Sequence, residues 1–144
     1  MAFDFGTLKQ SFFDSDKVMQ AVEKGKRRVL SKFGAFVRTR ARSSIRKRKK
    51  TSEPGQPPSS HAGQLRLIFF SWDDSTKSVV VGPIPFSGKR GEAVAPKLLE
   101  LGGTTTTETK RGPKTLHYQA RPFMQPALEA ESPKFAEQFK GMMQ

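Results

Sequence analysis

Apolar side chains recur mostly every third or fourth residue between Asp14 and Arg48, and this spacing predicts one long helix with a single apolar stripe. The stripe consists of Val18, Val22, Val29, Phe33, Val37, Ala41 and Ile45. Asp14 or Ser15 can cap the start, and cations gather near the end, where the helix dipole favours them. At about 1.5 Å per residue the helix reaches on the order of 50 Å, so we expect its last turns to project beyond a domain of this size.

The chain after this helix predicts a loop and then a β-hairpin. Residues 51–63 are built largely from Pro, Gly and Ser, so we expect a mobile loop. Two β-rich runs, 64–72 and 77–83, flank a polar turn and predict an antiparallel hairpin at the centre of the sheet. The apolar run 67–70 predicts that both faces of this hairpin are covered. The long helix would pack on one face, and a neighbour or another element on the other.

The rest of the chain predicts a short helix, a second hairpin and a C-terminal helix. Residues 93–103 have the pattern of a helix that stops at glycine, and the threonines of 104–107 favour a strand that turns at the basic tip 110–114. Pro122 suits the first turn of the last helix, and later prolines divide or kink it, so we expect 129–144 to be a loosely ordered tail. The buried side of this helix is expected to carry Phe123, Ala127 and Leu128. The expected fold is a single α+β domain, with a long N-terminal helix packed on a small antiparallel sheet of two hairpins, a short middle helix and a C-terminal helix.

The composition limits the kinds of site and function that the chain is expected to have. With 144 residues, 35% of them hydrophobic and 27% charged, the chain allows one domain with a thin core, which favours help from neighbouring subunits. It has no cysteine, and His61 and His117 stand apart without an acidic neighbour, so we expect no metal, no cofactor and no enzyme. Asp73 and Asp74 fall in the predicted turn, where a turn role is expected ahead of metal binding. No apolar run approaches a membrane span and the N-terminus lacks the order of a signal peptide, so we expect no membrane partner.

The net charge of +13 belongs mainly to the first part of the chain, because residues 1–50 hold 15 Lys and Arg against 4 Asp and Glu. Eight cations crowd the end of the predicted helix: Arg38, Arg40, Arg42, Arg46, Lys47, Arg48, Lys49 and Lys50. Such a density attracts polyanions, most obviously a nucleic-acid backbone, and Arg38, Arg42 and Arg46 would share one face at helical spacing. A solvated helix end that keeps the protein soluble is the other interpretation.

Three short elements, in this order and spacing, resemble those of a known protein family. A Gly-x-Leu-Arg element at Gly63, Leu65 and Arg66, a helix end at 100–102 with Leu for the family's Phe, and an Ala-Arg-Pro-Phe helix start at 120–123 are similar to the small neck or tail-completion proteins of long-tailed bacteriophages. The resemblance implies a non-enzymatic structural protein of the virion, assembled in the host cytoplasm, that forms a homo-oligomeric ring of six or twelve copies. It implies as partners the head connector or adaptor proteins, the tail terminator or tail tube proteins, and packaged double-stranded DNA bound without sequence preference.

This resemblance makes four further residues candidate subunit contacts. Arg66, at the entrance to a strand, is either a surface residue or an intersubunit clamp. Arg121 stands beside a helix start and can bridge a carboxylate of the same or the next subunit, with Glu100 as one candidate. Phe123 either anchors the last helix on the sheet or contacts a partner. The cations of 38–50 would line or rim the DNA passage, or dock on an acidic surface of an adjoining ring; a tail-terminator protein and a free nucleic-acid-binding protein remain the alternatives.

Overall fold

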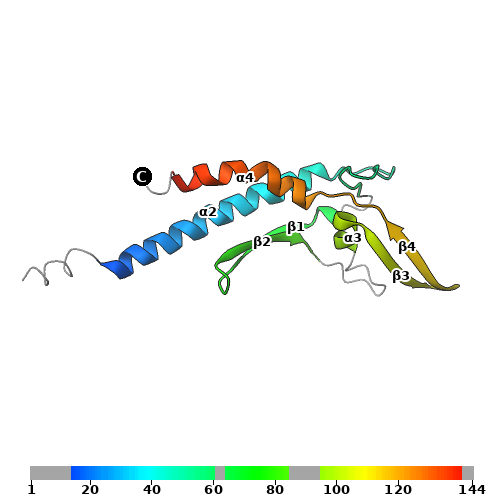
Figure 1. Ribbon diagram of the computed structural model, residues 1–144, viewed down its shortest axis with the longest axis horizontal. Helices are drawn as coiled ribbons and strands as arrows, with labels where there is room; N and C mark the ends of the chain where they lie inside the picture. The colour runs from blue at the N-terminus through cyan, green and yellow to red at the C-terminus, as the bar shows by residue number, and fades with distance from the viewer. Residues whose placement is uncertain (1–13, 61–63, 85–94, 141–144) are drawn as a thin grey trace, which may run out of the picture.

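The computed structural model describes residues 14–60, 64–84 and 95–140 and shows an α+β fold (Figure 1). The elements are α2 Ser15–Ser44, the 3₁₀ helix η1 Gln64–Arg66, β1 Ile68–Asp73, β2 Ser78–Pro83, α3 Ala95–Leu101, β3 Gly103–Thr109, β4 Gly112–Tyr118 and α4 Met124–Lys140. The predicted fold class and order of elements are confirmed, whereas several boundaries differ.

Helix α2 begins where the sequence predicts and ends earlier. The Asp14 side chain caps it by accepting a hydrogen bond from the Lys17 backbone N–H at 3.1 Å. The helix ends at Ser44 instead of continuing to about Arg48. The Ser44 hydroxyl donates to the Ala41 carbonyl at 2.8 Å and thereby satisfies one of the carbonyls that the next helical turn would have used. Ile45 then adopts an extended backbone and is fully buried, so the cations that follow lie outside the helix.

Helix α2 is the central element, with the β1–β2 hairpin along one side and α4 along another (Figure 1). Gly34 makes the approach of the hairpin possible, because a Cβ at this position would lie only 2.5 Å from the Val79 Cγ1 atom. On the α4 side, the rings of Phe33 and Phe135 lie 4.6 Å apart between centroids. The single apolar stripe predicted for α2 therefore serves two packing partners.

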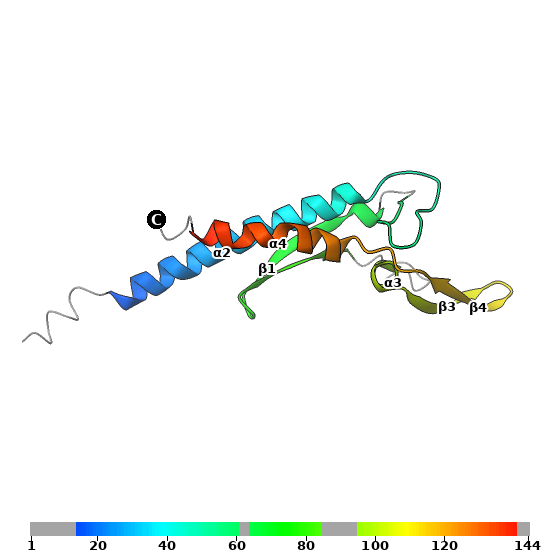
Figure 2. The ribbon, with the colours of Figure 1, turned by 45° about the horizontal axis from the view of Figure 1, so that its top comes forward.

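The core lies at the C-terminal half of α2, which corrects the prediction of a projecting C-terminal end. Its buried side chains are Val37, Ala41, Ile45, Leu65, Ile68, Phe123 and Ala127. The end that projects is the N-terminal one, where Val18, Met19 and Val22 are exposed (Figures 1 and 2). The stripe continues through these residues, but no described element reaches them.

The strands form two separate two-stranded antiparallel sheets, β1–β2 and β3–β4, and not the single small sheet that was predicted. Residues 64–66 form η1 and do not extend the first strand. The outer face of β1–β2 leaves Phe69 and Val80 exposed, so its expected second cover is not supplied by the described part of the chain. The threonine-rich β3–β4 hairpin has no fully buried side chain and extends away from the body (Figures 1 and 2). It therefore has little apolar surface to draw it onto the first hairpin.

The segment 51–60, the described part of the predicted mobile loop, packs on the body at several points. Ser52, Pro58 and Ser60 are buried. The Gly55 N–H donates to the Ala120 carbonyl at 2.9 Å, and the Ser60 N–H donates to the Arg46 carbonyl at 3.0 Å. Residues 61–63 lie outside the described residues, and mobility of the loop stays a prediction.

Helix α4 is longer and more continuous than predicted. It begins at Met124, so Pro122 precedes the first turn, and it continues through Pro133 to Lys140. The prediction of a loosely ordered tail is therefore wrong for residues 129–140, while 141–144 lie outside the description. Buried Glu131 and half-buried Phe135 hold this part of the helix against α2. Leu128 is exposed, contrary to its predicted place on the buried side.

Candidate functional site

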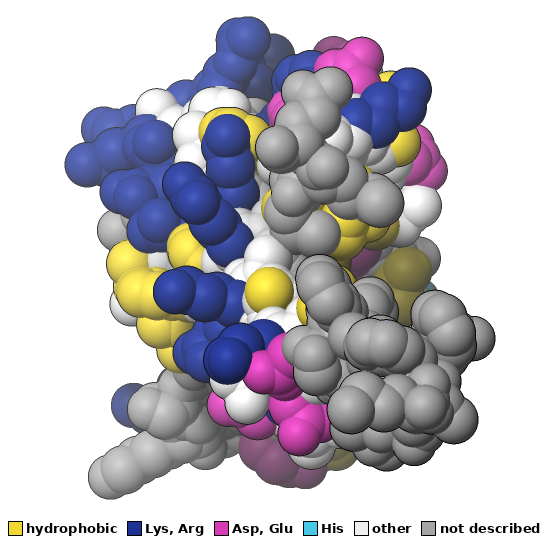
Figure 3. Space-filling view, turned by 90° about the vertical axis from the view of Figure 1, so that its left-hand side faces the viewer, with side chains coloured by type: hydrophobic (Ala, Val, Ile, Leu, Met, Phe, Trp, Pro, Cys, Tyr) yellow, Lys and Arg dark blue, Asp and Glu magenta, His cyan; other side chains and the backbone are white. Residues whose placement is uncertain are grey.

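The strongest concentration of charge lies along α2 and the segment that follows it. Between Lys24 and Lys50 the chain holds thirteen Lys and Arg and no Asp or Glu. At 3.6 residues per turn, six of these cations fall on one side of α2, next to the stripe that carries the core positions Val37 and Ala41. We call this side the basic face; its residues are Lys24, Arg27, Arg28, Lys32, Arg38 and Arg42. Figure 3 shows Lys and Arg side chains gathered over one side of the molecule, with the acidic groups at its margins.

Aromatic rings lie between the cations of the basic face. The Arg27 guanidinium lies 5.7 Å from the centroid of the Trp72 ring, and Arg38 lies 5.6 Å from that of Phe69. The Lys32 ammonium lies 6.0 Å from the centroid of the Phe36 ring on the same helix. A cation over a ring face is held in place while its remaining N–H donors stay available to solvent or to an anion. The basic face is therefore a partly ordered array of donors.

Two of the eight predicted cations are engaged inside the fold. Arg38 donates from Nε to the Ile68 carbonyl at 2.7 Å and so ties α2 to the first hairpin. Arg40 lies on the α4 side and forms an ion pair with the buried Glu131, which also contacts Lys134 at 3.3 Å. The hydrogen bond from Arg40 holds the pKa of the Glu131 carboxyl below its usual value against the opposing effect of desolvation, and Lys134 adds to the lowering. Arg40 is thus a structural residue and does not belong to the basic face.

The remaining predicted cations divide between the helix and the segment after it. Arg42 is exposed on the basic face, as its helical spacing from Arg38 predicts. The helix has ended before Arg46, so the predicted continuation of that spacing is wrong. Arg48 donates from Nε to the Ser59 hydroxyl at 3.3 Å. Arg46 and Arg48 line a polar cleft of about 360 Å³ together with Ser43, Ser44, Gln56 and Pro57, and Lys47, Lys49 and Lys50 are exposed.

Most of this charge is uncompensated by carboxylates. Among the thirteen cations between Lys24 and Lys50, Arg40 alone forms an ion pair with a carboxylate of the described residues. At a rise of about 1.5 Å per residue, the basic face from Lys24 to Arg42 is about 27 Å long, several Debye lengths at physiological salt. A polyanion of similar length could contact it at several points at once, which a small anion could not.

The predicted Arg121–Glu100 bridge is not formed within the chain. Glu100 instead caps α4, because its carboxylate accepts hydrogen bonds from the backbone N–H groups of Phe123, Met124 and Gln125 at 2.9, 3.1 and 2.8 Å. Arg121 donates from Nε to the Ser52 carbonyl at 3.0 Å and so holds the 51–60 segment. Each residue therefore has a folding role that the short motif alone did not reveal.

Phe123 and Arg66 also have a clear place in the chain. Phe123 is 1% exposed and belongs to the core, which corrects its assignment as a subunit contact and confirms the anchoring interpretation. Arg66 ends η1 and is half-buried, and its Nε atom is buried without a hydrogen-bond acceptor among the described residues. A clamp role for Arg66 between subunits stays a prediction.

Asp73 has the predicted turn role. Its carboxylate accepts hydrogen bonds from the Ser75 N–H at 2.9 Å, the Ser75 hydroxyl at 2.6 Å and the Thr76 hydroxyl at 2.8 Å. These donors lower the pKa of Asp73 to about 2. Asp74 accepts from the Trp72 indole N–H at 2.8 Å, which fixes the ring under Arg27.

The sequence interpretation missed the N-terminal half of the basic face and its aromatic partners. Lys24 and Arg28 are four residues apart and lie on the same side of the helix as Arg38 and Arg42. Their place on the basic face could therefore have been predicted from the spacing. Trp72 and Phe69 could not be found in this way, because their place beside α2 depends on the packing of the hairpin.

Other kinds of site receive no support in the described ranges. There, no three His, Cys, Asp or Glu side chains gather as a metal site would require, and no helix has the length and apolar character needed to cross a bilayer. Comparison of the chain with family models, with curated proteins and with solved structures finds no match.

Proposed function

We propose that this chain is a structural subunit of a ring at the head–tail joint of a long-tailed bacteriophage, linking the head connector to the tail and surrounding the DNA passage. The proposal rests on the three short sequence elements described above and on two features of the fold. The observation that carries it is that the chain is elongated and leaves apolar surface and strand edges uncovered over its described length.

The uncovered surface supports assembly as the normal state of the chain. Each sheet has only two strands, and an isolated hairpin is marginally stable in water unless another element covers it. Both strands of each sheet therefore offer an unpaired edge to a neighbour, at least as far as the described residues show. We expect subunit contacts from these edges, from the segment after α2 and from the ends of α2 and α4.

The basic face supports the placement of this ring around DNA. Duplex DNA carries one negative charge per about 1.7 Å of its axis, and a ring that surrounds it benefits from cations directed at phosphates. The cations of the basic face form no ion pairs with described carboxylates, and their spacing is that of the helix. Contacts of this kind are blind to sequence, as a passage for a whole genome requires.

Electron microscopy and native mass spectrometry of the purified full chain test the assembly. We expect closed rings of one copy number, either alone or after addition of the neighbouring neck proteins. A monodisperse monomer at high protein concentration and in the presence of those proteins contradicts the proposal. Uniform, capped tails made without this chain would exclude the tail-terminator alternative.

The run of cations from Lys24 to Lys50, which contains no Asp or Glu, also favours the second candidate, a free nucleic-acid-binding protein. Fluorescence anisotropy with duplex DNA at increasing salt separates the two. For the free binder we expect tight binding by the monomer, with a slope of log K against log salt that falls by about 0.9 for each phosphate contact removed. Arg28→Glu and Arg42→Glu are the informative variants, and Lys114→Glu on β4 is the control with the same change of charge. In the ring proposal, significant binding requires the assembled form.

A further inference from the structure

An open apolar groove lies where four elements meet. Side chains of α2, β2, α3 and α4 enclose about 750 Å³, and Phe33, Val81, Leu101 and Leu128 are among the residues that line it. Leu101 is 69% exposed and Leu128 is 41% exposed, so the groove is open to solvent. Most of its lining side chains are apolar, as in sites that bind apolar groups.

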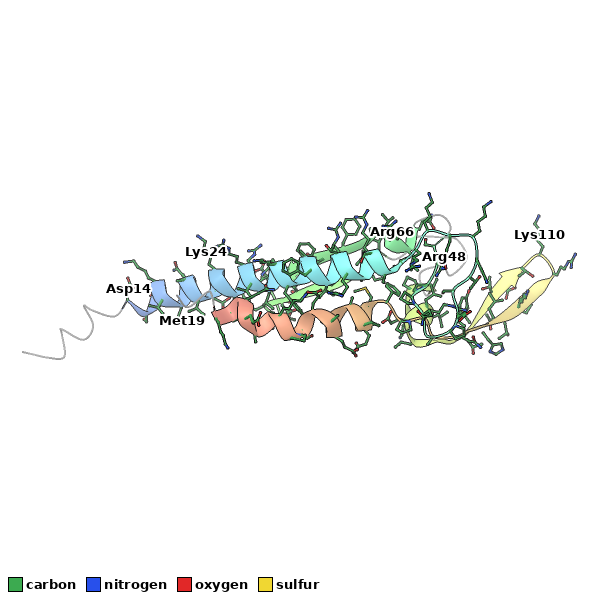
Figure 4. The ribbon with its side chains drawn as sticks, turned by 90° about the horizontal axis from the view of Figure 1, so that it is seen from above. Asp14, Met19, Lys24, Arg48, Arg66 and Lys110 are labelled. Atoms are coloured by element: carbon green, nitrogen blue, oxygen red, sulfur yellow. The ribbon has the colours of Figure 1, made fainter. Side chains whose placement is uncertain are left out.

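The same chain carries an apolar surface that has no partner among the described residues. Met19 is 62% exposed and Val22 is 50% exposed, and Val18 lies beside them on the projecting first turns of α2. These three side chains form what we call the overhang stripe. Figure 4 shows Met19 and Lys24 on opposite sides of α2, so the overhang stripe and the basic face point in different directions.

The groove and the overhang stripe cannot meet within one molecule. Phe33 of the groove and Val22 of the stripe belong to the same unbroken helix, eleven residues or about 16 Å apart along its axis. A helix cannot fold back on itself over this distance without breaking. Within the described ranges, the stripe of one copy can therefore reach this groove only on another copy.

We infer that the overhang stripe of one copy docks in the apolar groove of the next copy. This inference rests on the proposed function, because it takes the ring as the assembly and names one of its subunit contacts. The contact is heterologous, since two different surfaces meet, and such a contact closes into a ring when its rotation permits. One helical turn with three apolar side chains is an occupant of suitable size and polarity for a groove lined by leucine, valine and phenylalanine. Assembly through it leaves the basic face free for DNA.

Cysteine cross-linking tests the contact directly, because the chain has no cysteine of its own. Chains carrying Met19→Cys and chains carrying Leu128→Cys, tagged to differ in mass, are mixed and oxidised. We expect a covalent dimer containing one chain of each kind, and a ladder of covalent multimers when one chain carries both changes. Pairing Met19→Cys with Ala130→Cys is the control, since Ala130 is exposed on α4 two residues from Leu128, on a side of the helix away from the groove. The control pair is expected to cross-link at least about tenfold less under the same conditions.

A charge placed in the overhang stripe tests its energetic role. Val22→Glu is expected to raise the concentration for half-assembly by about a hundredfold, because the carboxylate would be buried without a partner. Ala130→Glu, which places the same charge at an exposed residue of α4 outside the groove, is expected to leave assembly within about threefold of the unchanged chain. Circular dichroism and thermal unfolding of the monomeric forms establish that both variants fold.

Four outcomes overturn the inference, and they separate it from the proposed function. An intrachain cross-link at high dilution would mean that the groove is reached within one molecule. Rings that form without the Met19–Leu128 cross-link and withstand Val22→Glu would contradict the contact and leave the ring proposal standing. Loss of binding to a different neck protein, with self-assembly unchanged, would assign the stripe to that partner. A chain that never self-associates, alone or with those proteins, would end both proposals.

Discussion

The carboxylate of Glu100 is the connection between α3 and the start of α4, and its removal gives a sharp test of the fold. In Glu100→Ala, the backbone N–H groups of Phe123, Met124 and Gln125 lose their common acceptor. Glu100→Gln keeps one carbonyl oxygen but removes the negative charge at the positive end of the helix dipole. The two variants therefore separate hydrogen bonding from charge.

The expected loss follows from the contacts. Removal of an ordinary capping side chain costs about 1 kcal/mol, and loss of a negative charge in the first helical turn costs a further 0.3 to about 1 kcal/mol. The hydrogen bonds from the Phe123 and Met124 N–H groups to Glu100 are partly buried. Water therefore cannot fully take the place of the carboxylate as their acceptor once it is removed. We expect Glu100→Ala to lower the free energy of unfolding by about 2 kcal/mol and Glu100→Gln by about 1 kcal/mol.

Urea denaturation followed by circular dichroism measures both variants, at a concentration below assembly. A loss of about 2 kcal/mol corresponds to a fall in Tm of about 6 to 8 °C for a chain of this size. Glu129→Ala, an exposed carboxylate that accepts a hydrogen bond from Gln125 on the same helix, is the control and should change stability by less than about 0.5 kcal/mol. If Glu100→Ala costs no more than this control, the capping argument is wrong.

Three further predictions concern the packing of α2 and the carboxyls of Glu131 and Asp73, whose pKa values are lowered. Gly34→Ala should destabilise the chain by about 1 kcal/mol in urea denaturation, since the overlap with Val79 outweighs the gain in helix propensity; a stabilised variant would refute the close approach. Because the pKa of Glu131 is lowered in the folded state, its bond to Arg40 stabilises the chain fully above its usual value of 4.5, and this stabilisation is lost as pH falls through the lowered pKa. The difference in unfolding free energy between the unchanged chain and Glu131→Gln should therefore be constant above a pH of about 5 and shrink in acid, and a difference that grows in acid would contradict this assignment. Asp73 should titrate with a midpoint at a pH of about 2 in carboxyl-detected NMR, and a midpoint at or above 3.8 would mean that the turn hydrogen bonds do not form in solution.

The sequence predicted the elements well where a local rule governs them. The cap at Asp14, the glycine stop after α3 at Gly102 and the two hairpins follow from capping, left-handed backbone and β-branching, all of which act over a few residues. The end of α2 was missed, because the run of basic residues after Ile45 gives no local signal against helix. Burial of Ile45 and the bond between Ser60 and Arg46 decide that boundary, and both depend on the folded loop.

The candidate site, too, was predictable from the sequence only in part. That α2 presents cations on one side follows from helical spacing, and Arg42 lies where this spacing predicts. The roles of Arg40, Glu100 and Arg121 did not follow from it, because each side chain bonds to a residue at least 20 positions away in the chain. A short motif names the residue type that a site requires, but the partner of that residue comes from another element.

By itself, the sequence determined the order and type of the elements and the concentration of positive charge in the first third of the chain, since these depend on neighbours within a turn or a strand. Only the tertiary structure decided which end of α2 projects, whether the strands form one sheet or two, and which cations bond to other elements of the fold. The physical reason is that these outcomes depend on which apolar surfaces pack together. Burial at Gly34, Ile45 and Phe123 joins segments that are distant in the chain, and what it leaves uncovered is the surface available to a partner.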